Sequence, residues 1–185
     1  GIAMAYALIY DLRSDPLGLK SKAAPLKQCA FLGFQIGAVG KAVWTIKAHA
    51  RFKRRVREIT RRNRGHRVQD VIDELRRYVS GWLNYFGISH TYTGVLELDE
   101  WLRRRVRLYY WKQWKQPRTR RRHLLALGID PKEVHMATRS RKGYWRMSGN
   151  SIVQRALTNR WLHEQGVPDI RKLWITLHYG AMARV

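Results

Sequence analysis

Apolar residues recur at helical spacing along most of the chain. In residues 48–62, Phe52, Val56 and Ile59 lie on one side of a helix, and basic residues take most of the remaining circumference. Residues 67–86 carry a fuller apolar stripe, and their polar face places acidic residues before basic ones, an order that favours a helix. The pattern predicts two amphipathic helices on a shared core, the first strongly positive and the second charge-balanced.

Before these helices, apolar and polar residues alternate, which is the pattern of a half-buried β-strand. We predict a β-hairpin around the turn "GAVGK", with these apolar residues on one face: Leu32, Phe34, Ile36, Ala42, Trp44 and Ile46. Residues 1–28 predict a short helix followed by a connection that proline and glycine interrupt. The hairpin is therefore the main β element that we expect.

A third helix is expected after a loop at residues 87–94. Asp99 is its candidate N-cap, and its apolar stripe includes Trp101 and Tyr110. Pro117 separates this helix from the rest of the chain. Together with the two preceding helices, it predicts a three-helix bundle.

The C-terminal third predicts several short helices. Thr119 and Asp130 are candidate N-caps, and the basic, aromatic segment at residues 139–150 predicts a loop. Helical spacing resumes in residues 151–166, and a last helix is expected near residues 169–178.

We therefore predict a mainly α fold in three parts. Residues 1–47 contain the hairpin, residues 48–116 form the helical bundle, and residues 117–185 form a small basic helical module. The 185 residues, 45% of them hydrophobic, suffice for one ordinary core or two small ones.

The stretch "RYVSGWLNYFG" gathers aromatic residues at the end of the second helix. Tyr78 and Trp82 continue the apolar stripe, so we place both side chains in the core. Gly81 is expected to let another backbone approach closely. Asn84 and Tyr85 are then the candidates in this stretch for contact with a nucleotide base.

The charge of the chain is strongly one-sided. The sequence has 37 Lys and Arg against 13 Asp and Glu, a formal net charge of +24 and a pI near 11.2. Several separate basic runs share this sign, which favours a polyanionic partner, with nucleic acid ahead of a membrane surface. Because phosphate contacts carry no sequence information, composition alone does not distinguish RNA from DNA.

The single cysteine, Cys29, excludes an internal disulfide and a cysteine-pair zinc motif. We expect it in the core, and we expect the chain in a reducing cytoplasm. The apolar N-terminal stretch is shorter than the ~20 residues that a membrane span needs. No membrane role is expected, and the sequence does not indicate the oligomeric state.

Catalytic groups are few. Asp11 and Asp15 are the acidic residues before Glu58, and no set of carboxylates is spaced to hold two metal ions for phosphoryl transfer. The seven histidines are scattered, and no nucleophile elbow is present. We therefore expect no catalytic residue, metal site or cofactor within this chain.

Several segments resemble the C-terminal part of a bacterial group II intron-encoded reverse transcriptase, the maturase. "APLKQCAFLGFQIG" resembles the end of that family's palm. "RFKRRVREITRRNRG", "VIDELRRYVSGWLNYFG" and "LDEWLRRRVRLYYWKQWKQP" resemble its maturase-specific domain X, the thumb. "SRKGYWRMSGNSIVQRALTNRWL" and "LWITLHYG" resemble the tail of compact bacterial members.

The resemblance implies a thumb-like helical bundle that follows a remnant of the palm. It implies an RNA-binding fragment that grips structured intron RNA or a primer–template duplex and assists intron splicing and mobility. In the family, a Y-A-D-D-type metal-binding motif lies upstream of the matching region. An alternative is therefore that the chain belongs to a full RNA-directed DNA polymerase, for which alone Mg²⁺ would be expected.

The candidate RNA-contacting residues are basic or aromatic, and the resemblance supports those in residues 51–64 and Arg103, Arg104 and Arg107. They are Arg51, Lys53, Arg54, Arg55, Arg57, Arg61, Arg62, Arg64, Arg103, Arg104, Arg107, Lys112, Lys115, Arg139, Arg141, Lys142, Tyr144, Trp145 and Arg146. Trp145 either stacks on a base or anchors its loop to the core. Trp111 and Trp114 are core residues, a stacking platform, or both.

A third interpretation concerns DNA. Short helices joined by a tight turn at residues 119–138 could place one helix in a major groove of target DNA. The candidate contacts are Arg118, Arg120, Arg121 and Arg122.

Overall fold

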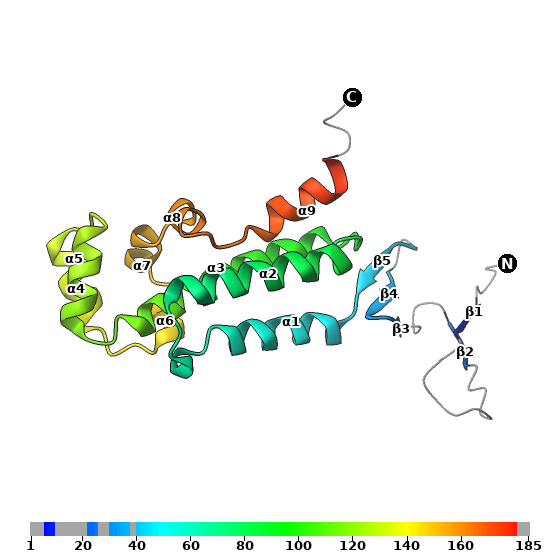
Figure 1. The fold of residues 1–185 in the computed structure, drawn as a ribbon, viewed down its shortest axis with the longest axis horizontal. Helices are drawn as coiled ribbons and strands as arrows, with labels where there is room; N and C mark the ends of the chain where they lie inside the picture. The colour runs from blue at the N-terminus through cyan, green and yellow to red at the C-terminus, as the bar shows by residue number, and fades with distance from the viewer. Residues whose placement is uncertain (1–5, 10–21, 26–29, 38–39, 181–185) are drawn as a thin grey trace.

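Two small antiparallel sheets precede the helices of the protein. The computed structural model describes residues 6–9, 22–25, 30–37 and 40–180 (Figure 1). One sheet pairs β1 (Tyr6–Ile9) with β2 (Lys22–Pro25), and the other orders β3 (Ala30–Phe31), β4 (Phe34–Ile36) and β5 (Ala42–Trp44). The prediction of a short helix within residues 1–28 is wrong at β1, where the chain is extended. Most of that segment, and Cys29, lie outside the described residues.

The predicted hairpin is confirmed by β4 and β5, in which Phe34 pairs with Trp44. Two predicted members of its apolar face are wrong. Leu32 lies in the β3–β4 turn with a φ of 51° and is 66% exposed. Ile46 is already helical and 82% exposed, because Thr45 ends the strand and caps the following helix.

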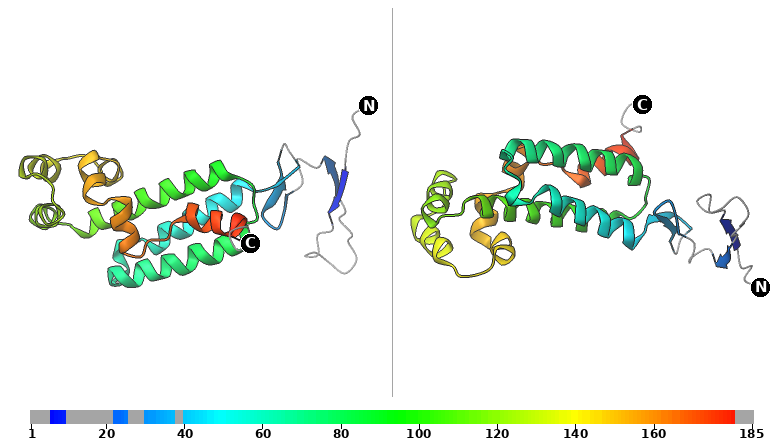
Figure 2. Two further views of the ribbon diagram at one scale, coloured as in Figure 1. Left: turned by 90° about the horizontal axis from the view of Figure 1, so that it is seen from above. Right: turned by 60° about the horizontal axis from the view of Figure 1, so that its bottom comes forward.

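Three long helices form the body of the molecule (Figures 1 and 2). They are α1 (Ile46–Ile59), α2 (Val68–Phe86) and α3 (Tyr92–Gln113), with the 3₁₀ turn η2 (Arg62–Arg64) between the first two. At the start of α1, Thr45 Oγ1 accepts a hydrogen bond from the N–H of Ala48 at 3.2 Å. The predicted three-helix bundle is confirmed.

The beginning of α3 differs from the prediction. The helix begins at Tyr92, and Asp99 is buried inside it, so its assignment as the N-cap of this helix is wrong. The loop before α3 is tied to the sheet, since the N–H of His90 donates to the carbonyl of Ala42 at 3.0 Å.

Six short helices follow in the described residues: α4 (Pro117–Ala126), α5 (Pro131–Arg139), α6 (Tyr144–Ser148), α7 (Ser151–Ala156), α8 (Asn159–Glu164) and α9 (Ile170–Tyr179). The cap at Asp130 is confirmed, but Thr119 is not a cap, since α4 already begins at Pro117. α4 and α5 lie at the end of α3 that is far from the sheets, and α9 packs against α2 and α3 (Figure 1). The core therefore continues across residue 117.

Trp82 lies at the centre of an aromatic cluster in the core. Its ring centroid is 5.2 Å from that of Trp44 and 4.8 Å from those of Phe52 and Phe86. Tyr78 is partly buried and stacks on Phe52 at 5.6 Å. The prediction that Tyr78 and Trp82 belong to the core is confirmed.

The predicted role of Gly81 is wrong. Gly81 is exposed, and a Cβ atom there would meet nothing within 4 Å. Close approach occurs instead at other glycines, among them Gly87 and Gly94. A Cβ at Gly87 would lie 2.7 Å from Leu177 Cδ1, and one at Gly94 would lie 2.8 Å from Trp44 Cζ2.

Candidate nucleic-acid interface

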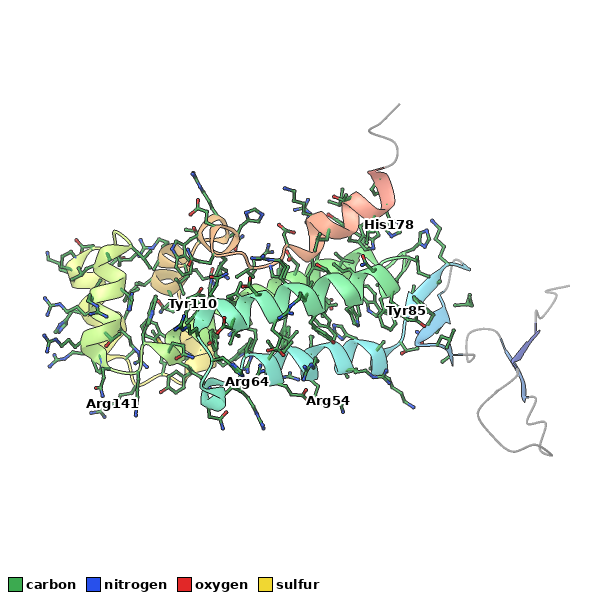
Figure 3. All side chains as sticks on the ribbon, viewed as in Figure 1. Arg54, Arg64, Tyr85, Tyr110, Arg141 and His178 are labelled. Carbon is green, nitrogen blue, oxygen red and sulfur yellow. The ribbon has the colours of Figure 1, made fainter. Side chains whose placement is uncertain are left out.

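The outer side of α1 is a row of arginines. Because Phe52, Val56 and Ile59 are fully buried, helical periodicity turns the opposite positions toward solvent. We call the exposed arginines of this side, together with Arg61 just beyond the end of α1, the α1 basic face: Arg51, Arg54, Arg57 and Arg61. Figure 3 shows Arg54 on the outer edge of the helix. Among the described residues, no carboxylate forms an ion pair with any of the four.

The positive surface continues from α1 onto α3 through Trp101. Lys53 Nζ and the guanidinium carbon of Arg57 lie 5.5 and 5.3 Å from the centroid of this ring. Arg105, one turn along α3, donates from Nε to Thr60 Oγ1 at 2.8 Å. Burial lowers the pKa of Arg105, and the like charge of Arg57 lowers it further. We did not predict Trp101 or Arg105 as site residues, although their i,i+4 spacing places both on one side of a helix.

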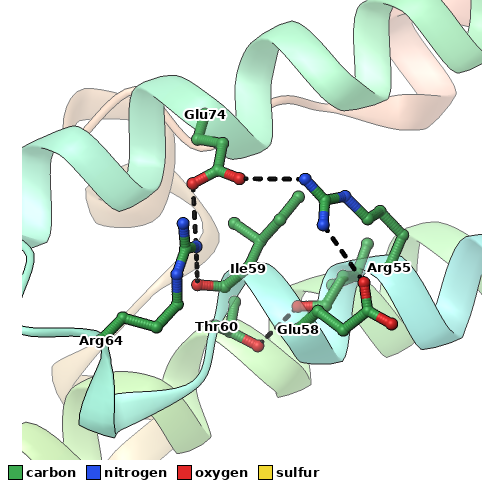
Figure 4. A network of polar contacts seen from close by, with 7 residues as sticks. Arg55, Glu58, Ile59, Thr60, Arg64 and Glu74 are labelled. Carbon is green, nitrogen blue, oxygen red and sulfur yellow. Dashed lines mark hydrogen bonds and ion pairs between the residues drawn. The ribbon is translucent and has the colours of Figure 1, made fainter.

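Two predicted contacts, Arg55 and Arg64, are held by Glu74 of α2 (Figure 4). Arg64 Nη1 lies 2.8 Å from Glu74 Oε2, and Arg55 Nη2 lies 3.3 Å from Glu74 Oε1. Arg55 also contacts Glu58 at 3.2 Å, and Arg64 donates to the carbonyl of Ile59 at 3.0 Å. These two arginines therefore join α1 and η2 to α2, which leaves less of their charge for a ligand.

Two of the arginines of α3 that we predicted to contact RNA instead bind buried groups of the protein. Arg103 Nη1 lies 2.6 Å from Asp99 Oδ2. Arg107 is 8% exposed and donates to the carbonyl of Leu157 and to Asn159 Oδ1, each at 2.8 Å. Burial lowers the pKa of Arg107, and the nearby charge of Arg103 adds to this effect. Arg107 thus holds α3 to the end of α7 and the start of α8, and we leave it out of the candidate surface.

The prediction of a loop at residues 139–150 is wrong for its second half, where residues Tyr144–Ser148 form α6. Met147 and Ser148 are buried and hold this helix against α3. Tyr144 and Trp145 are each 41% exposed. The helix thus exposes the rings of two consecutive residues to solvent, while Met147 and Ser148 anchor it.

Cations surround the rings of α6. The guanidinium carbon of Arg104 lies 4.3 Å from the centroid of Trp145. Lys112 Nζ and the guanidinium carbon of Arg120 lie 5.4 and 5.6 Å from the centroid of Tyr144. Positive groups and aromatic rings therefore alternate along α3, α6 and α4, an arrangement that suits stacked bases and phosphates.

Trp111 and Trp114 are core residues, 2% and 7% exposed. Arg120 covers Trp111, with its guanidinium carbon 4.6 Å from the ring centroid, and donates to the carbonyl of Trp114 at 2.8 Å. His123 stacks on Trp114 at 4.6 Å, and burial lowers the pKa of this histidine. Of the candidate DNA contacts, Arg120 therefore has a structural partner.

The remaining candidates are exposed on α4, α5 and the segments next to them. They are Lys115, Arg118, Arg121, Arg122, Arg139, Arg141, Lys142 and Arg146. The side chain of Arg62 is outside the described part of the chain. Asn84 and Tyr85 are exposed too, but Figure 3 shows Tyr85 and Arg141 at opposite ends of the molecule.

The chemistry of the surface is cationic and aromatic. In the part of the chain that the structure describes, no group of three or more His, Cys, Asp or Glu residues is placed to share a metal ion. None of the described helices has the length and apolar character for crossing a membrane. What the surface offers a ligand is charge for phosphates and ring faces for bases.

Residues 49–128 match the family model of the group II intron, maturase-specific domain. The match begins in α1 and ends just after α4, so it includes the α1 basic face and all of α2 and α3. It confirms the resemblance of this region to the C-terminal part of group II intron maturases and supports a maturase-type function in intron splicing. A comparison with curated proteins gives no match.

Proposed function

We propose that this protein, which contains a group II intron maturase-specific domain over residues 49–128, binds structured intron RNA through the α1 basic face and the adjoining edge of α3. The observation that carries the proposal is the set of four exposed arginines, three on one side of α1 and Arg61 just beyond its end. Within the described residues these arginines have no carboxylate partner.

Phosphate contact follows from the geometry of the row. Arg51 and Arg57 are separated by six positions, or roughly 9 Å along the axis of α1, and Arg61 follows just beyond the end of the helix. A row of that length can neutralise several phosphates at once, and each neutralised phosphate releases counterions. The guanidinium group of Arg57 also packs over the ring of Trp101. Because this contact already restricts the side chain, less conformational entropy is lost when Arg57 is ordered against RNA.

The decisive experiment removes two charges from this face without touching a packed side chain. We would compare Arg54→Gln/Arg61→Gln with the control Arg171→Gln/Lys172→Gln on α9, which lies across α2 and α3 from α1 (Figure 1). Binding to a group II intron RNA is measured by filter retention between 50 and 200 mM salt. The slope of log K against log salt should fall by roughly 1.4–1.8 for the α1 variant and by much less for the control.

If the slope of log K against log salt fell equally in both variants, the proposal would be contradicted, because the effect would come from net charge and not from this surface. The preference for RNA is tested separately with duplex DNA of the same length and charge. We expect the RNA to bind more tightly. Equal affinities with equal slopes would remove the claim of RNA preference.

We further propose contact with target DNA through α4. Arg118, Arg121 and Arg122 are exposed on this helix, and a short turn joins it to α5. Reversing these three charges should weaken binding to duplex DNA and leave most of the affinity for intron RNA. If the reversal instead weakened binding to intron RNA and left binding to duplex DNA intact, α4 would belong to the RNA-binding surface.

A role in intron mobility, within a longer RNA-directed DNA polymerase, is a further proposal. It is supported by the resemblance of "APLKQCAFLGFQIG" to the end of the family's palm. In this proposal Mg²⁺ belongs to the palm of the longer protein. Reading the frame upstream of Gly1 for a Y-A-D-D-type segment tests it, and a stop codon close to Gly1 would contradict it.

A further inference from the structure

We propose that Tyr144 and Trp145 on α6 form a stacking site for an unpaired base of the bound RNA. This inference rests on the proposed RNA-binding function. It adds recognition of unpaired nucleotides to the phosphate contacts of the α1 basic face.

Trp145 differs from the other tryptophans in its exposure. All eight tryptophans lie in the described part of the chain: five are buried, two are partly buried, and Trp145 is 41% exposed. Tyr144, the residue before it, is exposed to the same extent. Large rings normally gain by burial, so two neighbouring exposed rings on an anchored helix indicate a binding surface.

The backbone under Trp145 is fixed in place before any ligand binds. Its carbonyl accepts hydrogen bonds from Arg104 Nη2 at 3.2 Å and from Ser148 Oγ at 2.7 Å. Met147, two residues further along, is 1% exposed and fastens α6 to the core. A base that stacks on Trp145 therefore costs little ordering of the protein, which favours binding.

Arg104 also decides which side of the indole a base can use. Its guanidinium carbon is 4.3 Å from the ring centroid, so it covers one face of Trp145. A base that stacks on the other side completes a layered arrangement of guanidinium, indole and base. Lys112 and Arg120, beside Tyr144, supply positive charge for the phosphates that flank such a base.

The class of nucleotide follows from how bases are presented in RNA. In an A-form helix each base is stacked on its neighbours, and its ring faces are not available to a protein. A bulged, looped or terminal base has a free face. The site should therefore distinguish RNA with an unpaired nucleotide from the same RNA fully paired.

The test uses the full chain and two fluorescein-labelled RNA hairpins that differ by one bulged 2-aminopurine. Trp145→Leu removes the aromatic ring, and Trp145→Phe keeps a ring in its place. Tyr179→Leu is the control, since Tyr179 is an exposed aromatic residue on α9. Stacking is also read directly from quenching of 2-aminopurine fluorescence when protein is added.

Trp145→Leu should weaken binding of the bulged hairpin by about 5- to 150-fold, the range typical of one lost base–aromatic contact. The factor should be nearly the same at every salt concentration, because no phosphate contact is removed. The affinity for the fully paired hairpin should change by less than about 2-fold. The parent protein and Trp145→Phe should quench 2-aminopurine, and Trp145→Leu should not.

Two outcomes overturn the stacking site alone. Equal weakening of both hairpins by Trp145→Leu would show that the ring acts by holding Arg104. Absence of quenching by the parent protein at saturation would show that no base stacks there, and this readout does not depend on whether a variant folds. Failure of the parent to bind either hairpin would instead overturn the proposed RNA-binding function, and this inference with it.

Discussion

Asp99, buried inside α3, accepts a hydrogen bond on Oδ1 from the backbone N–H of Ile170 at 3.0 Å. Ile170 is the first residue of α9, so Asp99 satisfies one of the N–H groups that a helix leaves free at its beginning. Its other oxygen lies 2.6 Å from Arg103. One carboxylate of the bundle thus fixes the start of the last helix, which packs across α2 and α3.

Replacing Asp99 by alanine should lower the free energy of unfolding by about 1–3 kcal/mol. The substitution leaves the N–H of Ile170 without its buried acceptor and removes the partner of Arg103. Asp99→Asn keeps a carbonyl acceptor and should lose less. Urea denaturation of the two variants measures the difference, and an Asp99→Ala variant as stable as the parent would contradict this role.

The same carboxyl predicts an unusual dependence of stability on pH. Burial raises the pKa of Asp99 above its usual value of 3.8, and the opposing effects of Arg103 and the backbone N–H of Ile170 do not cancel this. The folded protein therefore keeps the proton to a higher pH than the unfolded chain does. The stability that Asp99 contributes is present at low pH and is lost as pH rises through the folded pKa.

We therefore expect the free energy of unfolding of the parent, relative to that of Asp99→Asn, to fall as pH rises from about 4. Urea denaturation in half-unit steps between pH 3.5 and 6.5 measures this difference for both proteins. A difference that instead grew with pH would mean that the pairing with Arg103 dominates and that the pKa is lowered.

Local pattern was enough to predict α1 and α2, because their apolar stripes recur over several turns and only a buried side accommodates them. It was not enough for Asp99. An acidic residue before an apolar run has the local pattern of an N-cap, but the N–H group that it binds lies 71 positions later. Gly81 was misplaced for a similar reason, since the sequence holds no information on which glycine faces a neighbour.

For the site, the sequence predicted which residues are basic but not which of them are neutralised. Arg64 and Arg55 were equivalent to Arg54 in the pattern, and their pairing with Glu74 depends on how α1 and α2 lie together. α6 was missed because five residues are too few to show a helical period. Its anchoring depends on Met147, a single apolar residue in a basic segment.

Because Glu74 pairs with Arg55 and Arg64, removing its charge should lower the stability of the protein and raise its affinity for RNA. Glu74→Gln should lower the free energy of unfolding by about 1 kcal/mol, since Arg55 and Arg64 lose a partly buried partner. The same change removes one acceptor from each arginine, which leaves more of their positive charge for a ligand, and should tighten binding to intron RNA at low salt. Urea denaturation and filter binding test the two effects.

The matched control for that experiment is Glu58→Gln, because Glu58 contacts Arg55 at an exposed position and does not reach Arg64. It removes the same charge with little cost in stability. If Glu74→Gln weakened RNA binding while the protein stayed folded, the arginines would need Glu74 to hold them in a binding geometry.

Two helical glycines predict opposite responses to the same substitution. Gly81→Ala adds a methyl group into open space on α2, so the protein should gain about 0.5–1 kcal/mol from the better helix propensity of alanine. Gly94→Ala adds the same group on α3 at 2.8 Å from Trp44 Cζ2, and should cost about 1–3 kcal/mol because the indole is fixed in the core. Thermal unfolding should therefore shift the two midpoints in opposite directions. If Gly94→Ala raised the midpoint as Gly81→Ala does, the sheet that carries Trp44 would not be packed tightly against α3.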